Sequence, residues 1–253
     1  MNSSPDSIPQ TIVIEPRSGW QLIDWKELIE YSDLFYFLVK RDVLAIYKQT
    51  VLGFTWAIIR PVFSMIVFSM VFGGLAKIPS DGIPYPLFSY TALIPWTYFS
   101  AAMNSSTQSL IIGKGIFTKV YFPRLVIPLT PVLSKLVDFL IAFIILFGLM
   151  VWYGITPTLN IIFIPILTLM MMLTAAGIGT WLSAMAIQYR DIPQGVGFLS
   201  QMLMYAAPVV WPLSLLQDKF GESFALAYGI YPMVGVVEGF RSALLGQTPM
   251  PWA

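Results

Sequence analysis

The chain has 253 residues, of which 57% are hydrophobic and 11% are charged, whereas a soluble domain of this length carries about 25% charged residues. This composition indicates a polytopic membrane protein, and the net charge of +1 gives no indication of a nucleic acid or an acidic substrate. Cysteine and histidine are both absent, which excludes disulfides, thiolate metal sites and cysteine nucleophiles, and leaves no histidine for metal binding or general base catalysis.

The N-terminal part of the chain divides into a polar tail and an amphipathic segment. Residues 1–19 contain no apolar core, which predicts a flexible cytoplasmic tail without a cleavable signal peptide. From 20 to 47, tryptophan, leucine and phenylalanine recur between charged residues at helical spacing. This pattern predicts a helix that lies in the cytoplasmic membrane interface, and a helix packed on a soluble partner is the alternative.

Residues 48–253 form the predicted transmembrane domain. A hydrocarbon layer about 30 Å thick requires about 20 apolar residues, or fewer where flanking side chains snorkel. Five segments qualify, and they run approximately over 52–75, 87–103, 125–153, 159–187 and 196–216. The stretch 224–246 is less apolar and is interrupted by glycine and proline, so we predict a re-entrant or surface helical hairpin there. The predicted fold is therefore an all-α polytopic membrane protein.

Basic residues in the loops predict the orientation of the spans. The N-terminal side carries Arg17, Lys26, Lys40, Arg41, Lys48, Lys114, Lys119, Arg124 and Arg190, and the other side carries Lys77, Lys219 and Arg241. The N-terminus is therefore expected in the cytoplasm and the 224–246 hairpin outside. The last residues follow without a closing basic segment, so the chain is expected to be truncated.

Arg60 and Pro61 lie inside the first apolar segment. If Trp56 marks the membrane interface, Arg60 lies about 6 Å deeper and its guanidinium can snorkel to the cytoplasmic headgroups. Near the start of the embedded helix, the missing amide proton of Pro61 is tolerated by a bend.

Aromatic residues are concentrated around the second apolar segment. Trp96, Tyr98 and Phe99 lie deepest, and aromatic rings suit either anchoring among headgroups or stacking on a sugar ring. We predict the sugar-stacking role for these three residues. The prolines that interrupt the spans are Pro95, Pro208 and Pro212. Such breaks are tolerated where the freed carbonyls face protein or water, which favours a cavity.

Charged residues form two pairs with the same spacing. Lys135 and Asp138 stand three residues apart in the third segment, where they share a helical face and neutralise each other. Such a pair either holds helices in register or lines a translocation path, because intramembrane charges commonly face an aqueous cavity. Glu238 and Arg241 repeat the spacing, and the same two interpretations apply.

The sequence lacks the motifs of catalytic and nucleotide-binding sites. Its one Gly-Lys pair, Gly113-Lys114, has Gln108 and Gly115 where a phosphate-binding loop requires glycine and Ser or Thr. No pattern of metal ligands or of catalytic triad residues occurs. No catalytic residue, metal or cofactor is therefore predicted in this chain, and a membrane glycosyltransferase or acyltransferase is the enzymatic alternative.

Six stretches of the chain together resemble the motifs of a known protein family. They are "YKQTVLGFTWAIIRP" at 47–61, "IPWTYFSAAMNSS" at 94–106, "FTKVYFPRLVIPL" at 117–129, "QYRDIPQ" at 188–194, "QMLMYAAPVVW" at 201–211 and "YPMVGVVEGFRSALLG" at 231–246. In this order and spacing, the chain resembles the permease subunit of type-2 ABC exporters of lipid-linked polysaccharides. Within that group it is most similar to O-antigen export permeases.

The resemblance implies six transmembrane helices per subunit, an N-terminal interface helix and two external re-entrant helices before the last span, so that this chain ends before the sixth helix. It implies a homodimer that encloses a channel in the inner membrane, with two cytoplasmic ATPase subunits that carry ATP and Mg. The implied substrate is a glycan on an undecaprenyl diphosphate carrier, surrounded by membrane lipids.

Functional residues follow from the same resemblance. The loop 104–123 matches the segment that couples the permease to its ATPase. The coupling residues are Lys114, Lys119, Arg124, Arg190 and Asp191, although Arg190 and Asp191 have a local ion pair as the alternative. The expected substrate residues are Trp96, Tyr98 and Phe99, with Arg60 for the diphosphate of the carrier, because a guanidinium matches phosphate oxygens bidentately. Lys135 and Asp138, as intramembrane charges, are the further candidates for the channel lining. Glu238 and Arg241 match the external re-entrant segment and are expected to pair across the channel mouth.

Related functions remain open. Exporters of teichoic acid or capsule polysaccharide resemble O-antigen permeases so closely that sequence separates them poorly. A drug-efflux permease of the same superfamily is less favoured, because neither a long extracellular domain nor an ATPase occurs in the chain.

Overall fold

The computed structural model describes residues 25–48, 55–117, 121–221 and 227–246. Over these ranges the regular secondary structure is helical and contains no strand, so the predicted all-α fold is confirmed. The described segments that are long and apolar enough to cross a membrane are Thr55–Leu75, Val126–Tyr153 and Leu159–Gln188. The predicted tail, residues 1–19, lies outside the described residues.

The predicted interface helix is divided into two helices, α1 (Trp25–Glu30) and α2 (Ser32–Lys48). The α2 helix packs on α6, where Leu38 joins a buried apolar cluster at the start of that helix. Tyr36 and Phe37 nevertheless remain 68% and 65% exposed. The amphipathic segment therefore packs on its own chain on one side and keeps apolar surface that suits a membrane interface on another.

The centre of the molecule is α4 (Tyr85–Ile112), which follows α3 (Thr55–Phe68) and the π-helical segment Ser69–Leu75. The α4 helix packs against α3, α6, α7, α8, α9 and α12. The prediction of a loop over 104–123 is wrong in its first part, because α4 continues to Ile112 and is followed by α5 (Lys114–Phe117).

Polar residues do not end α4, because their side chains find partners inside the bundle. The Ser106 hydroxyl donates to the Pro128 carbonyl of α6 at 2.7 Å, and the Thr107 hydroxyl donates to the Met103 carbonyl at 2.8 Å. Satisfied hydroxyls can be buried at little net penalty, so helical structure persists through a sequence that reads as a polar loop.

The third predicted span is interrupted at Lys135, which separates α6 (Val126–Ser134) from α7 (Leu136–Tyr153). The fourth begins as a 3₁₀ turn, Leu159–Phe163, and continues as α8 (Ile164–Gln188). Both agree with the predicted ranges to within a residue.

The last predicted elements agree with expectation only in part. The helix α9 (Ile192–Ala206) ends before Pro208, and α10 (Leu213–Phe220) starts after Pro212, so the predicted interruption of the 196–216 segment at these prolines is confirmed. Proline lacks an amide proton and disfavours helix in the preceding residue, which explains the break. The helix α12 (Pro232–Leu245) packs against α4 and α8 and is buried, so the surface interpretation of 224–246 is wrong.

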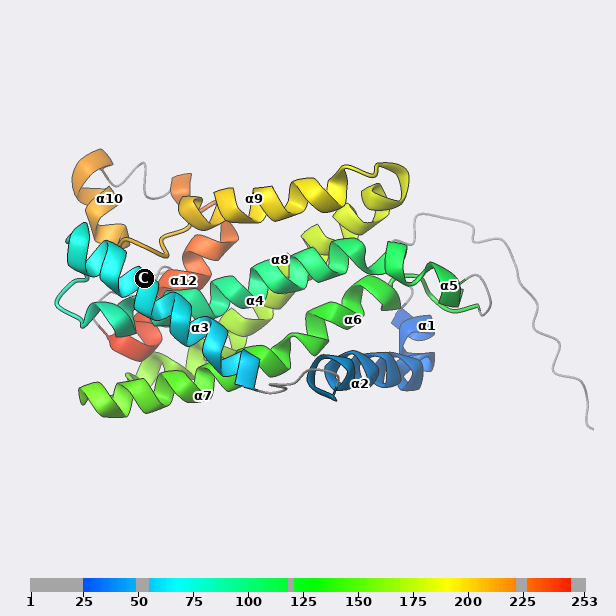
Figure 1. Ribbon diagram of the computed structural model, residues 1–253, viewed down its shortest axis with the longest axis horizontal. Helices are drawn as coiled ribbons and strands as arrows, with labels where there is room; N and C mark the ends of the chain where they lie inside the picture. The colour runs from blue at the N-terminus through cyan, green and yellow to red at the C-terminus, as the bar shows by residue number, and fades with distance from the viewer. Residues whose placement is uncertain (1–24, 49–54, 118–120, 222–226, 247–253) are drawn as a thin grey trace, which may run out of the picture.

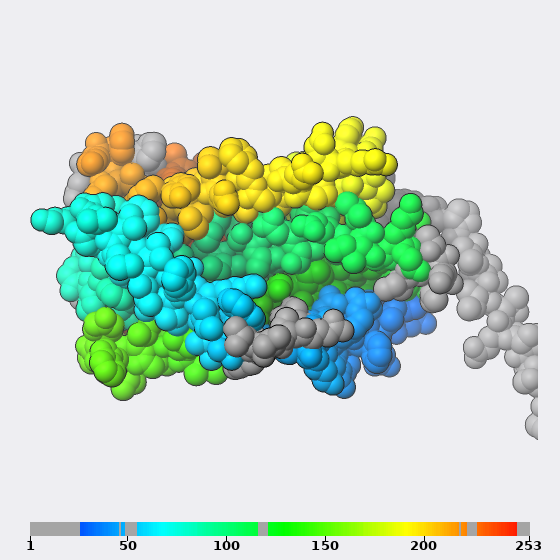
Figure 2. All heavy atoms as spheres, viewed as in Figure 1, coloured from blue at the N-terminus to red at the C-terminus, as the bar shows by residue number. Residues whose placement is uncertain are grey.

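The elements divide between two ends of the long axis (Figure 1). The helices α1, α2 and α5 lie at one end together with the turn between α8 and α9, and α10 and α12 lie toward the other. On the face shown in Figure 2, α4 is visible between α3 and α9. The bundle therefore presents the basic N-terminal side of the predicted topology at a single end.

A close approach of α4 and α8 gives the first prediction. A Cβ atom at Gly179 would lie 2.7 Å from both Cβ and Oγ of Ser106, whereas one at Gly177 would meet open space. We expect Gly179→Ala to lower the free energy of unfolding by about 1–3 kcal/mol through overpacking. Gly177→Ala, the matched control, should be neutral or stabilising by about 0.5–1 kcal/mol, as for glycine within a helix. Unfolding of the purified protein in detergent measures both, and equal behaviour of the two variants would contradict the prediction.

Candidate functional site

A cavity lies between the start of α3, the middle of α4 and the start of α7, and we call it the α3–α7 cavity. Its volume is about 260 Å³. It is lined by Tyr47, Trp56, Ala57, Arg60, Pro61, Ser64, Thr97, Tyr98, Ala101, Lys135, Asp138, Phe139 and Ala142. Four predicted substrate residues, Arg60, Tyr98, Lys135 and Asp138, are therefore brought together around one space.

Lys135 and Asp138 form the predicted ion pair, with Nζ and Oδ2 3.5 Å apart. The other carboxylate oxygen of Asp138 accepts a hydrogen bond from the Tyr47 hydroxyl at the end of α2. Burial raises the pKa of Tyr47, and the hydrogen bond and charge of Asp138 raise it further, so the hydroxyl keeps its proton and acts as donor. Asp138 thus joins the interface helix α2 to α7.

Arg60 supplies the positive charge that this cavity has in excess. Its guanidinium lies 5.5 Å from the centroid of the Trp56 ring, within the range of a cation–π contact. Among the described residues no acidic side chain forms an ion pair with Arg60, whereas Lys135 is neutralised by Asp138. The cavity can therefore accept an anion, and its arginine can bind phosphate oxygens bidentately.

The remaining predicted substrate residues lie outside the cavity lining. Trp96 and Phe99 are 3% and 0% exposed, with their ring centroids 5.5 Å apart in the core. Tyr98 is buried as well, and its hydroxyl donates to the Val132 carbonyl at 2.8 Å. Neither Trp96 nor Phe99 offers a free ring face in this subunit, so the arrangement gives no support to sugar stacking by these two residues.

Sequence reasoning missed a row of polar side chains along α4. Thr97 and Gln108 are exposed, and Ser100 and Asn104 between them are half-buried. Their spacing of three or four residues puts them on one side of the helix. This periodicity is present in the sequence, but the apolar residues that surround these positions obscure it. The row brings hydrogen-bonding groups to the surface of an otherwise apolar bundle.

The predicted coupling residues are at the end of the molecule that carries α5 and the α8–α9 turn (Figure 1). Lys114, Arg124, Arg190 and Asp191 are all exposed there. No ion pair joins Arg190 to Asp191 among the described residues, so the alternative of a local pair has no support. Lys119 lies outside the described residues. Contact of this surface with an ATPase stays a prediction.

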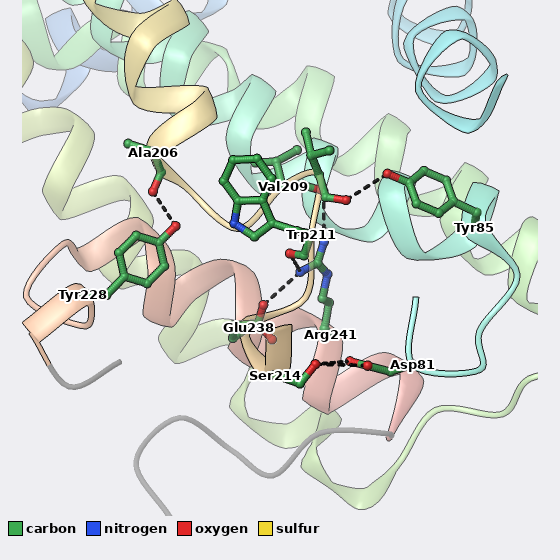
Figure 3. Close-up of polar contacts among 10 residues, drawn as sticks. Asp81, Tyr85, Ala206, Val209, Trp211, Ser214, Tyr228, Glu238 and Arg241 are labelled. Carbon is green, nitrogen blue, oxygen red and sulfur yellow. Dashed lines mark hydrogen bonds and ion pairs between the residues drawn. The ribbon is translucent and has the colours of Figure 1, made fainter. Parts of the chain in front are cut away.

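Glu238 and Arg241 pair within α12, which corrects the expectation of a pair across a channel mouth (Figure 3). Arg241 Nη1 donates to Glu238 Oε1 at 2.8 Å, and both side chains are buried. The pair forms inside one helix because a spacing of three residues brings the two side chains to the same face.

The same arginine holds the chain after α9. Its Nη2 donates to the Val209 carbonyl at 3.0 Å and its Nη1 to the Trp211 carbonyl at 3.2 Å (Figure 3). The guanidinium carbon lies 3.7 Å from the centroid of the Phe88 ring of α4. Arg241 thereby satisfies two carbonyls of the non-helical segment between α9 and α10.

Metal binding has no obvious place in this arrangement. Within the described ranges, no three acidic side chains gather closely enough to hold a metal ion. What the α3–α7 cavity can do follows from its arginine and hydroxyl groups, namely to bind an anion by charge and hydrogen bonds.

Comparison with known proteins gives consistent matches over nearly the whole chain. The family described as "ABC-2 type transporter" matches residues 33–245. The chain is 29% identical to the O-antigen export system permease protein RfbA of Myxococcus xanthus over 86% of this chain and 82% of that protein. It is 26% identical to RfbA of Klebsiella pneumoniae over 84% and 80% of the two chains. The polysialic acid transport protein KpsM of Escherichia coli is 24% identical over 82% and 80%.

Proposed function

The chain belongs to the ABC-2 type transporter family, and from this membership we propose that it is the permease subunit of an ATP-driven exporter of lipid-linked polysaccharide, of the O-antigen type. The observation that carries the proposal is the alignment with O-antigen permeases over more than four-fifths of both chains in the first relative. The chain itself then performs no chemical step, and ATP and Mg belong to a separate ATPase subunit.

The α3–α7 cavity supports a carrier with phosphate groups as substrate. Its net positive charge comes from Arg60. Lys135 lines the same cavity, and its ammonium group could exchange its contact with the Asp138 carboxylate for a contact with phosphate. An undecaprenyl diphosphate headgroup has the charge and the oxygen geometry that a guanidinium binds bidentately. We infer that this headgroup binds at Arg60 and Lys135 before the glycan is moved.

The proposed assembly is a homodimer with two ATPase subunits in the inner membrane. Large apolar residues are exposed on α3, α7 and α8, among them Phe63, Ile144 and Leu173, and lipid or a second subunit would cover them. The exposed Lys114, Arg124 and Arg190 at one end suit the cytoplasmic side, which agrees with a cytoplasmic N-terminus.

A polymer such as polysialic acid is the second candidate substrate, because the polysialic acid transport protein KpsM aligns at 24% identity over a similar share of both chains, and export of capsule polysaccharide remains the alternative. The higher identity to RfbA, 29%, favours O-antigen export.

The proposal is tested by co-purifying the chain with a candidate ATPase subunit and measuring the ATP-dependent appearance of carrier-linked glycan on the far side of vesicles. Appearance of glycan only with both proteins and ATP is the expected result. Turnover of a lipid-linked sugar by the chain without an ATPase, or unchanged surface glycan after deletion of its gene, would contradict it.

A further inference from the structure

A second cavity lies between α2, α4 and α6, and we call it the α2–α6 cavity. Its volume is about 520 Å³, within the range of about 300–1,000 Å³ that small-ligand sites occupy. It lies at the end of the molecule that carries α1, α2 and α5 (Figure 1). Exposed residues such as Gln108 and Arg41 belong to its lining, so it opens to the surface.

The lining of the α2–α6 cavity is mostly apolar by area, and it includes neutral hydrogen-bonding groups from two helices. From α4 come Asn104, Ser105, Gln108 and Ser109, and from α6 come Thr130 and Ser134. The charged pair on its α2 wall is internally neutralised, since Arg41 Nη2 lies 2.7 Å from Asp42 Oδ1. Amide and hydroxyl side chains in a neutral setting suit the hydroxyl groups of a sugar better than an ion or an apolar ligand.

Some of these groups have hydrogen-bonding capacity to spare. Neither the Ser105 nor the Gln108 side chain forms a hydrogen bond with another described residue. Asn104 uses only its amide nitrogen, which donates to the Ser100 carbonyl at 2.7 Å and to Ser200 Oγ at 3.2 Å, so its carbonyl oxygen can accept. Phe122 also belongs to the lining, but its side chain is only 4% exposed, so the hydrogen-bonding groups alone support a sugar as ligand.

The two cavities meet at Lys135, which lines both. The lysine stands at the junction of α6 and α7, with the cationic α3–α7 cavity on one side and the neutral α2–α6 cavity on the other. In a glycan linked to a lipid diphosphate, the first sugar is bonded directly to the phosphate that such a lysine would hold. The diphosphate and the first sugar are adjacent in the ligand, just as the α3–α7 and α2–α6 cavities are adjacent at Lys135.

We propose that the α2–α6 cavity binds the first sugar of the lipid-linked glycan, with Gln108 and Ser105 as hydrogen-bonding residues, while Lys135 and Arg60 hold the diphosphate. The inference rests on the proposed function, because it takes a lipid diphosphate as the substrate. It adds a specificity site inside one subunit that recognises a sugar ring instead of the diphosphate common to all such carriers.

Binding of two synthetic probes to the purified full-length chain in detergent tests the inference. One probe is a short isoprenyl diphosphate that carries a single N-acetylhexosamine, and the other is the same isoprenyl diphosphate without sugar. The variant Ser105→Ala/Gln108→Leu removes the hydrogen-bonding groups. Gln217→Leu, on α10 toward the opposite end, removes an exposed amide of the same kind and is the matched control.

We expect the wild type to bind the sugar-bearing probe roughly tenfold more tightly than the sugar-free probe, as two hydrogen bonds would give. The double variant should lose this difference and keep its affinity for the sugar-free probe, and Gln217→Leu should behave as the wild type. A wild type that binds both probes equally, or a double variant that weakens both alike, would overturn the sugar site. A wild type that binds neither probe would instead overturn the proposed carrier substrate.

Discussion

Arg241→Met is expected to lower the free energy of unfolding by about 3–5 kcal/mol, because it leaves a buried carboxylate without its partner. Glu238 is 3% exposed and is paired with Arg241 at 2.8 Å. The substitution also removes the donors to the Val209 and Trp211 carbonyls, which lie in a segment without helical hydrogen bonds. Thermal unfolding of the purified protein, together with its yield from membranes, measures the loss.

The double variant Glu238→Gln/Arg241→Met separates the unpaired charge from the lost donors. A neutral amide can be buried at a much smaller penalty than a carboxylate, so the double variant should recover a substantial part of the stability. If the double variant is as unstable as Arg241→Met, the hydrogen bonds to the 207–212 segment dominate. If Arg241→Met unfolds as the wild type does, the buried pair has no stabilising role.

Arg60→Gln is expected to weaken binding of a sugar-free isoprenyl diphosphate by at least about tenfold and to lower glycan export to a similar extent. The reason is the loss of a charge-assisted, bidentate contact with phosphate. The loss of affinity is limited because Arg60 is exposed and its charge is screened by solvent. Arg60→Lys keeps the charge and loses the planar guanidinium, so its affinity for the probe should lie between those of the wild type and Arg60→Gln. Lys219→Gln, on α10 away from the cavity, removes one exposed positive charge and serves as the control.

The Arg60 series has two informative failures. If Arg60→Lys behaves as the wild type, the guanidinium geometry is not used and only its charge matters. If Arg60→Gln also binds the probe and exports glycan normally, Arg60 has no part in carrier recognition and snorkelling toward headgroups explains its position.

The fold was most predictable where the sequence is uniformly apolar. The ranges of the first, third and fourth spans agree closely with Thr55–Leu75, Val126–Tyr153 and Leu159–Gln188, because continuous apolar runs with polar ends leave few alternatives. The Lys135–Asp138 pair was equally predictable, since a spacing of three residues in a helix fixes the proximity of the side chains.

The features that could not be predicted depend on contacts between residues far apart in the sequence. Ser106 reads as part of a polar loop until its hydroxyl is seen to donate to the Pro128 carbonyl 22 residues further along the chain. The burial of α12 depends on carbonyls after α9 that satisfy Arg241, and no local pattern reveals such partners. For Trp96 and Phe99, the type of residue suggested contact with a ligand, but the direction of each ring is set by neighbouring helices.

The hydrogen bond from Tyr47 to Asp138 has a mechanical consequence. Tyr47 belongs to the last turn of α2, and Asp138 to the first turn of α7. While the bond persists, a displacement of the end of α2 moves the Tyr47 hydroxyl, and we expect this to reorient the carboxylate that holds Lys135. A movement of α2 would therefore change the charge balance of the α3–α7 cavity through side chains alone.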